Sequence, residues 1–118
     1  MEEGSGFKEK RRGRRVQINL PLNFQVIGPE VYLGTALDAS ETGLFIQTVK
    51  ELKVGTKVRI LLSLPEGSGQ PQIDAIAEIM WKEACMLEDW EGFQYGLKFI
   101  QISQEDDRAL KQALNKLV

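Results

Sequence analysis

The sequence predicts a mostly β protein, either an antiparallel barrel or a sandwich, that ends in one α-helix. Apolar and polar residues alternate in six short segments separated by turn-forming residues, which is typical of half-buried strands. Residues 103–117 change to helical spacing. The length of 118 residues suits a single hydrophobic core. We expect residues 1–7 to be disordered and residues 8–118 to form one domain.

The six predicted strands follow from the alternation, and the turns between them follow from Gly, Pro, Asp and Ser. The alternating segments are residues 16–26, 31–37, 44–48, 58–64, 73–81 and 95–99. An acidic stretch, residues 88–92, is expected to be a loop. Phe24, Trp81 and Phe99 lie in phase with the apolar positions, so we expect all three in the core.

The predicted C-terminal helix covers residues 103–117. Ser103 followed by Asp106 resembles a capping box, with Asp in place of the usual Glu. After it, apolar residues recur on one face, which would pack against the sheet. These residues are Ala109, Leu110, Ala113, Leu114 and Leu117.

The composition excludes several chemistries. The chain has no His and one Cys, Cys85, so a Ser-His-Asp triad, a Cys-His pair and a His-based metal site are ruled out. No phosphate-binding glycine loop, metal-ligand spacing or nucleophile motif is present. We therefore expect no enzyme, no catalytic residue, no metal and no cofactor. Because the sequence shows neither a transmembrane run nor a signal peptide, we expect a cytoplasmic protein.

The charge is unevenly distributed along the chain. Residues 1–15 carry six basic and three acidic side chains, while the remainder carries nine basic and fourteen acidic ones. A flexible basic arm thus precedes an acidic body. Its stretch Lys10-Arg11-Arg12-Gly13-Arg14-Arg15 is either a solvated tail or a clamp for an anion. Guanidinium groups bond phosphate or the O6 and N7 atoms of guanine with two hydrogen bonds each.

A second candidate is the segment Asp38-x-Ser40-x-x-Gly43. Between two strands these residue types form a β-turn, which is the simpler interpretation. The same carboxylate can accept hydrogen bonds from the N1–H and N2–H₂ groups of guanine. A nearby hydroxyl and a residue without a side chain would let a nucleotide approach closely.

In combination these segments resemble the PilZ domain family. The resemblance consists of R-x-x-x-R, then D-x-S-x-x-G-L-F-I, then Leu52-Lys53-Val54-Gly55-Thr56, Leu64-Pro65, Ile79-Met80-Trp81 and Gly96-Leu97-Lys98-Phe99. It covers residues 8–117. It implies a six-stranded antiparallel barrel that binds cyclic di-GMP, a bacterial second messenger.

The resemblance also implies a role for each site residue. Arg11 and Arg15 would clamp the phosphates and one guanine edge from the arm. Asp38 and Ser40 would read a guanine from the barrel surface, and Gly43 would keep the turn open. Lys10 and Arg12 are possible additional contacts, with Lys10 favouring two stacked ligand molecules over one. Ligand binding would fold the arm onto the barrel, and an unidentified effector protein would read the change.

Two other functions fit the sequence less well. An adaptor with this fold that does not bind the nucleotide would be expected to lack the arginine pair or the Asp38/Ser40 motif, and this chain keeps both. A barrel that binds single-stranded nucleic acid needs exposed aromatic and basic residues along one sheet face. Here an acidic body would repel a long phosphate backbone, so we expect no long nucleic acid as a partner.

Overall fold

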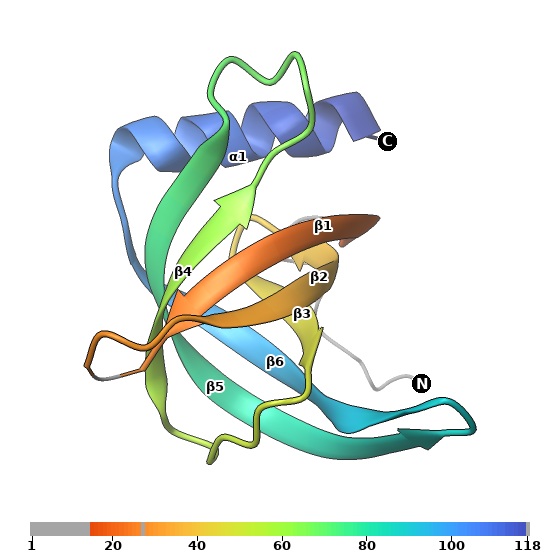
Figure 1. Ribbon diagram of the computed structural model, residues 1–118. Coiled ribbons are helices and arrows are strands. Elements are labelled where there is room, and N and C mark those ends of the chain that lie inside the picture. The colour runs from red at the N-terminus through yellow and green to blue at the C-terminus, as the bar shows by residue number, and fades with distance from the viewer. Residues whose placement is uncertain (1–14, 27, 118) are drawn as a thin grey trace, which may run out of the picture.

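Six antiparallel strands form a closed barrel in the computed structural model, which describes residues 15–26 and 28–117 (Figure 1). The strands follow one another around the barrel in the order β1-β2-β3-β6-β5-β4, and β1 pairs with β4 to close it. This confirms the six-stranded antiparallel barrel. The elements are β1 (Val16–Gln25), β2 (Tyr32–Ser40), β3 (Gly43–Thr48), β4 (Lys57–Ser63), β5 (Gln72–Leu87), β6 (Trp90–Ile102) and α1 (Gln104–Leu117).

The apolar side chains of the predicted alternation point inward and fill the barrel interior. Inward positions from all six strands form one apolar core, which includes Leu22, Phe24, Ile46, Ile60, Leu62, Ile79 and Tyr95. Phe24 is fully buried and Phe99 packs against the core from a partly buried position, as expected. Because side chains alternate between faces along each strand, the remaining positions point outward and form the outer surface.

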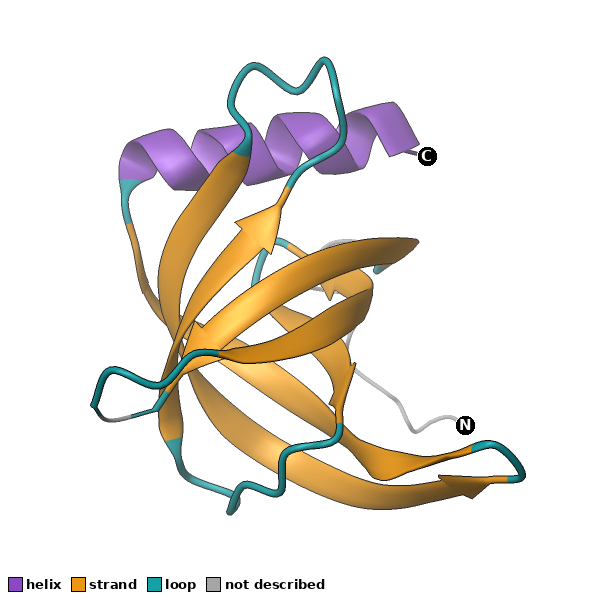
Figure 2. Cartoon of the chain, in the orientation of Figure 1, coloured by secondary structure: helices purple, strands orange, loops and turns teal. Residues whose placement is uncertain are grey.

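The β5–β6 hairpin is longer than the alternation predicts. β5 continues to Leu87 and β6 begins at Trp90, so the connecting turn holds only Glu88 and Asp89. The prediction of a loop over residues 88–92 was therefore wrong for its last three residues, which are strand. The hairpin extends well beyond the rest of the barrel (Figures 1 and 2).

Trp81 does not lie in the core, contrary to the prediction. The register between β5 and β6 shifts between Ile79 and Trp81, so Met80 is an extra residue and forms a β-bulge. The bulge reverses the alternation, because every later side chain changes face. Ile79 is therefore buried, whereas 44% of Trp81 is exposed on the outer surface.

The C-terminal helix begins one residue later than predicted and lies against the barrel (Figure 2). Its predicted apolar stripe is buried except for Leu117 in the last turn, which is 43% exposed. Ser103 caps the helix, because its Oγ accepts a hydrogen bond from the Asp106 N–H at 3.0 Å. The capping box is only half formed. The Asp106 carboxylate accepts hydrogen bonds from the Asp74 N–H at 3.1 Å and from the Gln70 side chain at 2.8 Å, which joins the helix to β5.

Two further predictions are the domain boundary and the absence of a membrane-spanning segment. The proposed boundary between residues 1–7 and 8–118 lies outside the described residues and stays a prediction. Among the described residues, no helix is both long and apolar enough to cross a membrane.

Candidate functional site

A row of directly paired residues crosses five strands on the outer face of the barrel. Gln17 of β1 pairs with Asp38 of β2, and Asp38 pairs with Phe45 of β3. Phe45 pairs with Gly96 of β6, and Gly96 pairs with Trp81 of β5. Directly opposite residues in antiparallel strands place their side chains on the same face. The row thus brings a carboxylate and two aromatic rings onto one surface.

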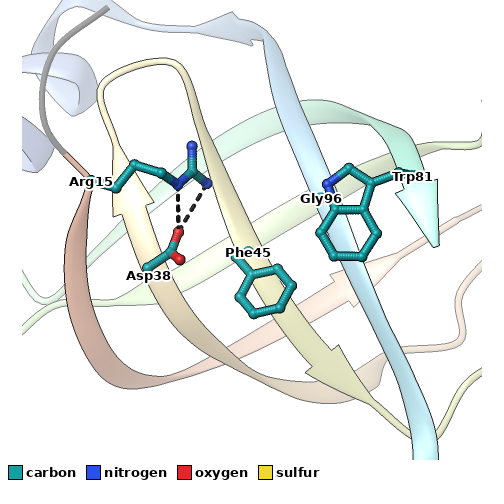
Figure 3. Close-up of a pocket in the computed structure, with 5 residues that line it drawn as sticks. All are labelled: Arg15, Asp38, Phe45, Trp81 and Gly96. Carbon is teal, nitrogen blue, oxygen red and sulfur yellow. Dashed lines mark hydrogen bonds and ion pairs between the residues drawn. The ribbon is translucent and has the colours of Figure 1, made fainter. Parts of the chain in front are cut away.

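Arg15, just before β1, contacts Asp38 at the polar end of this row (Figure 3). The guanidinium donates from Nε to Asp38 Oδ1 at 3.0 Å, and a second guanidinium nitrogen lies 2.9 Å from the same oxygen. Both side chains are partly exposed, and such pairs contribute only about 0.2–1 kcal/mol. A ligand that bonds both groups can therefore replace the pair at little cost.

The other end of the row is aromatic. The rings of Phe45 and Trp81 lie with centroids 5.3 Å apart and planes inclined by 33°. They meet because Gly96, between them in the register, has no side chain. A Cβ at position 96 would overlap the indole ring of Trp81.

Together these residues line an open pocket of about 340 Å³, formed by Arg15, Asp38, Phe45, Trp81 and Gly96 (Figure 3). Such a volume is near the lower end for small-molecule sites. Its walls offer a hydrogen-bond acceptor, a cation and an aromatic face. This combination suits a planar, hydrogen-bonding and negatively charged ligand.

Ser40 and Gly43 lie at the end of the same β2–β3 hairpin but do not line the pocket. Ser40 is buried, and its Oγ accepts the Thr42 N–H at 3.2 Å and lies 3.1 Å from the Thr42 hydroxyl. Gly43 sits against β6, where an added Cβ would collide with the Leu97 carbonyl oxygen. In the structure both residues shape the turn that follows Asp38.

The remaining predicted residues, Lys10, Arg11 and Arg12, lie outside the described part of the chain. Of the predicted contacts, the structure brings Arg15 and Asp38 together. It adds Phe45, Trp81 and Gly96, which sequence reasoning missed as site residues. Phe45 lies within the D-x-S-x-x-G-L-F-I segment, and Gly96 pairs with Trp81, where any Cβ would overlap the indole.

Solved structures share this fold. The PilZ domain with c-di-GMP of YcgR from Escherichia coli superposes with a TM-score of 0.73 at 15% identity, covering 92% of this chain and 92% of that one. The Bacillus subtilis inhibitor of motility MotI/DgrA gives a TM-score of 0.73 at 21% identity, over 92% of this chain and 51% of that one. Apo MrkH of K. pneumonia gives 0.75 at 19% identity, over 95% of this chain and 52% of that one.

This chain therefore spans about half the length of MotI/DgrA and MrkH. No curated protein sequence matches it. The family model for the PilZ domain, in contrast, matches residues 9–116, which is nearly the whole sequence. That match agrees with the closed six-stranded barrel, its C-terminal helix and the order of the sequence segments. The chain belongs to the PilZ domain family.

Proposed function

We propose that this protein is a non-catalytic receptor for cyclic di-GMP that passes the signal to a partner protein. The observation that carries the proposal is the Arg15–Asp38 pair, placed beside the Phe45–Trp81 rings where the basic arm joins the barrel. Family membership supports it, and so does the structure of the YcgR PilZ domain with c-di-GMP.

Asp38 is the group that would recognise guanine. In Figure 3 its second carboxylate oxygen points away from Arg15. A carboxylate can accept from N1–H and N2–H₂ of one guanine at the same time, and hydrogen bonds to a charged group are the stronger ones. Adenine offers no such pair of donors, so the same contact would favour guanine over adenine.

Arg15 would change partner when the nucleotide binds. Its guanidinium can leave Asp38 and bond a phosphate or the O6 and N7 atoms of guanine, since the surface ion pair is weak. Arg11, four residues earlier, would supply the second guanidinium of the clamp, with Lys10 and Arg12 as possible additional contacts. The Phe45 and Trp81 rings would contact the apolar parts of the base.

Ser40 and Gly43 would act mainly by holding Asp38 in place. Ser40 can contact the ligand directly only if its hydroxyl turns away from Thr42. Binding would fold the arm over the pocket and create a new surface for an effector, which is an order–disorder mechanism for converting a small ligand into a protein signal.

Calorimetric titration tests the proposal. Cyclic di-GMP should bind with measurable heat, and its affinity should fall as NaCl is added, because the clamp is an exposed charge pairing. Cyclic di-AMP and GTP serve as controls for base and for shape. Heat equal to that of buffer at high micromolar cyclic di-GMP would overturn the proposal and favour an adaptor that does not bind the nucleotide.

A further inference from the structure

The outer face that holds the pocket continues along the β5–β6 extension, defined here as residues 81–94. Beyond the Trp81–Gly96 pair, Cys85 pairs with Gly92 and Leu87 pairs with Trp90. These residues share the face of Trp81, because paired residues point the same way and every second residue faces the same side. A continuous surface therefore leads from the nucleotide pocket to the tip of the hairpin.

The tip combines exposed apolar and acidic side chains. Leu87, on the face of Trp81, is 61% exposed, and Met86, which pairs with Glu91 on the opposite face of the tip, is 76% exposed. Nearby, the ring of Trp90 occupies the space above Gly92. Such large apolar side chains rarely gather on a solvent-exposed hairpin unless something covers them.

The extension is also strongly acidic. It carries four acidic side chains, and its one basic residue, Lys82, is paired with Glu51 at 2.7 Å. The acidic side chains are those of Glu83, Glu88, Asp89 and Glu91. An apolar tip surrounded by acids fits a basic segment that also carries an apolar side chain.

The chain's own arm has this chemistry and begins at the right place. Residues 8–15 carry a net charge of +5 and follow Phe7 directly. Arg15 lines the same pocket as Trp81, at the base of the extension. From Arg15, the eight residues back to Phe7 span up to about 26 Å when extended. Trp81 to Leu87 spans about 20 Å of strand, so Phe7 can reach the tip.

We propose that, without the nucleotide, the basic arm (residues 8–15, with Phe7) binds along the outer face of the β5–β6 extension. This inference rests on the proposed function, since it describes where the same arm resides before it closes on the ligand. A second copy of the protein is a poor occupant, because two extensions of net charge −3 would repel each other. The arm contributes the opposite charge in the same molecule.

The contact is loose and competes with ligand binding. Exposed ion pairs contribute little each, so the arm exchanges between bound and free positions. Cyclic di-GMP would draw Arg11 and Arg15 into the pocket and withdraw Phe7 from the tip. The nucleotide would thereby uncover Leu87 and Trp90 for a partner, which links the ligand to a surface that it does not touch.

Paramagnetic relaxation tests the contact in the full chain. We would place a nitroxide label on Ser5→Cys in a Cys85→Ser background and record backbone amide signals. Without nucleotide, amides 83–92 should broaden selectively. The broadening should disappear at 0.5 M NaCl or at saturating cyclic di-GMP.

Matched variants separate this contact from a general charge effect. Glu88→Gln with Asp89→Asn should abolish the broadening and tighten cyclic di-GMP binding roughly two- to fivefold, because the arm is no longer held at the hairpin. Glu66→Gln with Glu105→Gln removes the same charge from exposed positions elsewhere and should change neither.

Three outcomes would overturn the inference. These are unbroadened hairpin amides, equal effects of the two double variants, and broadening that appears only between molecules in a mixture of labelled and isotope-enriched chains. The last result would identify a second copy as the occupant. Calorimetry keeps the two proposals apart: broadened amides without binding heat refute the receptor function alone, whereas heat without broadening refutes only the arm–hairpin contact.

Discussion

The indole of Trp81 occupies the space in which a side chain at position 96 would stand. A Cβ built on Gly96 would lie 2.6 Å from Cδ1 and 2.8 Å from Cε2 of that indole, closer than such atoms approach in proteins. The ring thus lies flat against the β6 backbone and beside Phe45. This position of Trp81 gives the pocket its aromatic wall.

Gly96→Ala should therefore disturb both stability and ligand binding. The added methyl group displaces the indole, and overpacking of this kind costs about 1–3 kcal/mol. In a Trp81→Ala background the same substitution should cost much less, because the clash is gone. Urea unfolding of the wild type, both single variants and the double variant gives the coupling free energy between positions 81 and 96. Additive effects would mean that the two residues do not constrain each other.

Asp38→Ala should weaken cyclic di-GMP binding by about 30- to 1000-fold and leave the fold intact. The variant removes two charge-assisted hydrogen bonds to guanine, which water replaces in part, for a net loss of about 2–4 kcal/mol. Cyclic di-AMP should be rejected by a similar factor. Calorimetry measures both affinities, and equal affinity for the two nucleotides would show that Asp38 does not read the base.

Asp74→Ala is a matched control for that experiment. Asp74 also pairs with an arginine on the outer surface, with the guanidinium of Arg59 donating at 3.1 and 2.6 Å. This pair holds the pKa of Asp74 below its usual value. It lies away from the Phe45–Trp81 rings, so its loss should leave nucleotide affinity unchanged. A comparable loss of affinity would indicate a general charge effect.

The sequence was sufficient to predict six half-buried strands, because alternation with a period of two records which side of a strand is buried. That alternation left a barrel and a sandwich open, and the barrel was implied by the resemblance to the PilZ domain family. The sequence was insufficient for Trp81, because a single inserted residue, Met80, reverses the phase without any change in the apolar pattern. It also missed Gly96 as a site residue. A glycine that accommodates a distant side chain is recognisable only when the register between strands is known.

The Asp38-x-Ser40-x-x-Gly43 segment shows a different limit. From sequence, a turn and a ligand site were alternative explanations. In the structure Ser40 and Gly43 build the turn and its packing, while Asp38 faces the pocket.

The prediction of a capping box at the C-terminal helix failed in part because of a contact between residues far apart in the sequence. Asp106 bonds Asp74 and Gln70, which are far away in sequence, in place of its own helix terminus.

Tyr95→Phe should destabilise the barrel by about 1–3 kcal/mol. The buried hydroxyl accepts the Leu52 N–H at 2.7 Å and donates to the Lys50 carbonyl at 2.8 Å, so both backbone groups would lose their partner. Tyr32→Phe is the control. Its hydroxyl donates only to the exposed Glu30 carboxylate, and the loss should stay within about 0.5 kcal/mol. Urea unfolding at neutral pH compares the variants, and equal losses would contradict the role of Tyr95.

The same residue predicts a pH dependence. Burial raises the pKa of Tyr95 above its ordinary value of about 10, so folding favours the neutral phenol. The stabilisation is complete below that pH and is lost as the pH rises through the folded-state pKa. From pH 9 to pH 11 the wild type should lose stability more steeply than Tyr95→Phe. Parallel curves would show that another group dominates alkaline unfolding.

Cyclic di-GMP should order the basic arm, residues 8–15. Fixing the backbone costs about 1–2 kcal/mol per residue, or about 8–16 kcal/mol for eight residues. The arm has a net charge of +5 and only Phe7 beside it as a large apolar anchor, so neither the arm itself nor its loose contact with the β5–β6 extension offsets this cost. A dianion bonded by Arg11 and Arg15 neutralises part of that charge and bonds both guanidiniums.

Limited trypsin digestion measures this ordering, because the arm offers six basic cleavage sites. The ligand should slow cleavage after residues 11–15 far more than cleavage at Lys53, an exposed residue in the loop before β4 that serves as an internal reference. Arg11→Ala with Arg15→Ala should abolish both nucleotide binding and the remaining protection. An arm that resists trypsin equally with and without ligand, or that stays labile at saturation, would refute the folding step even if calorimetry shows that the nucleotide binds.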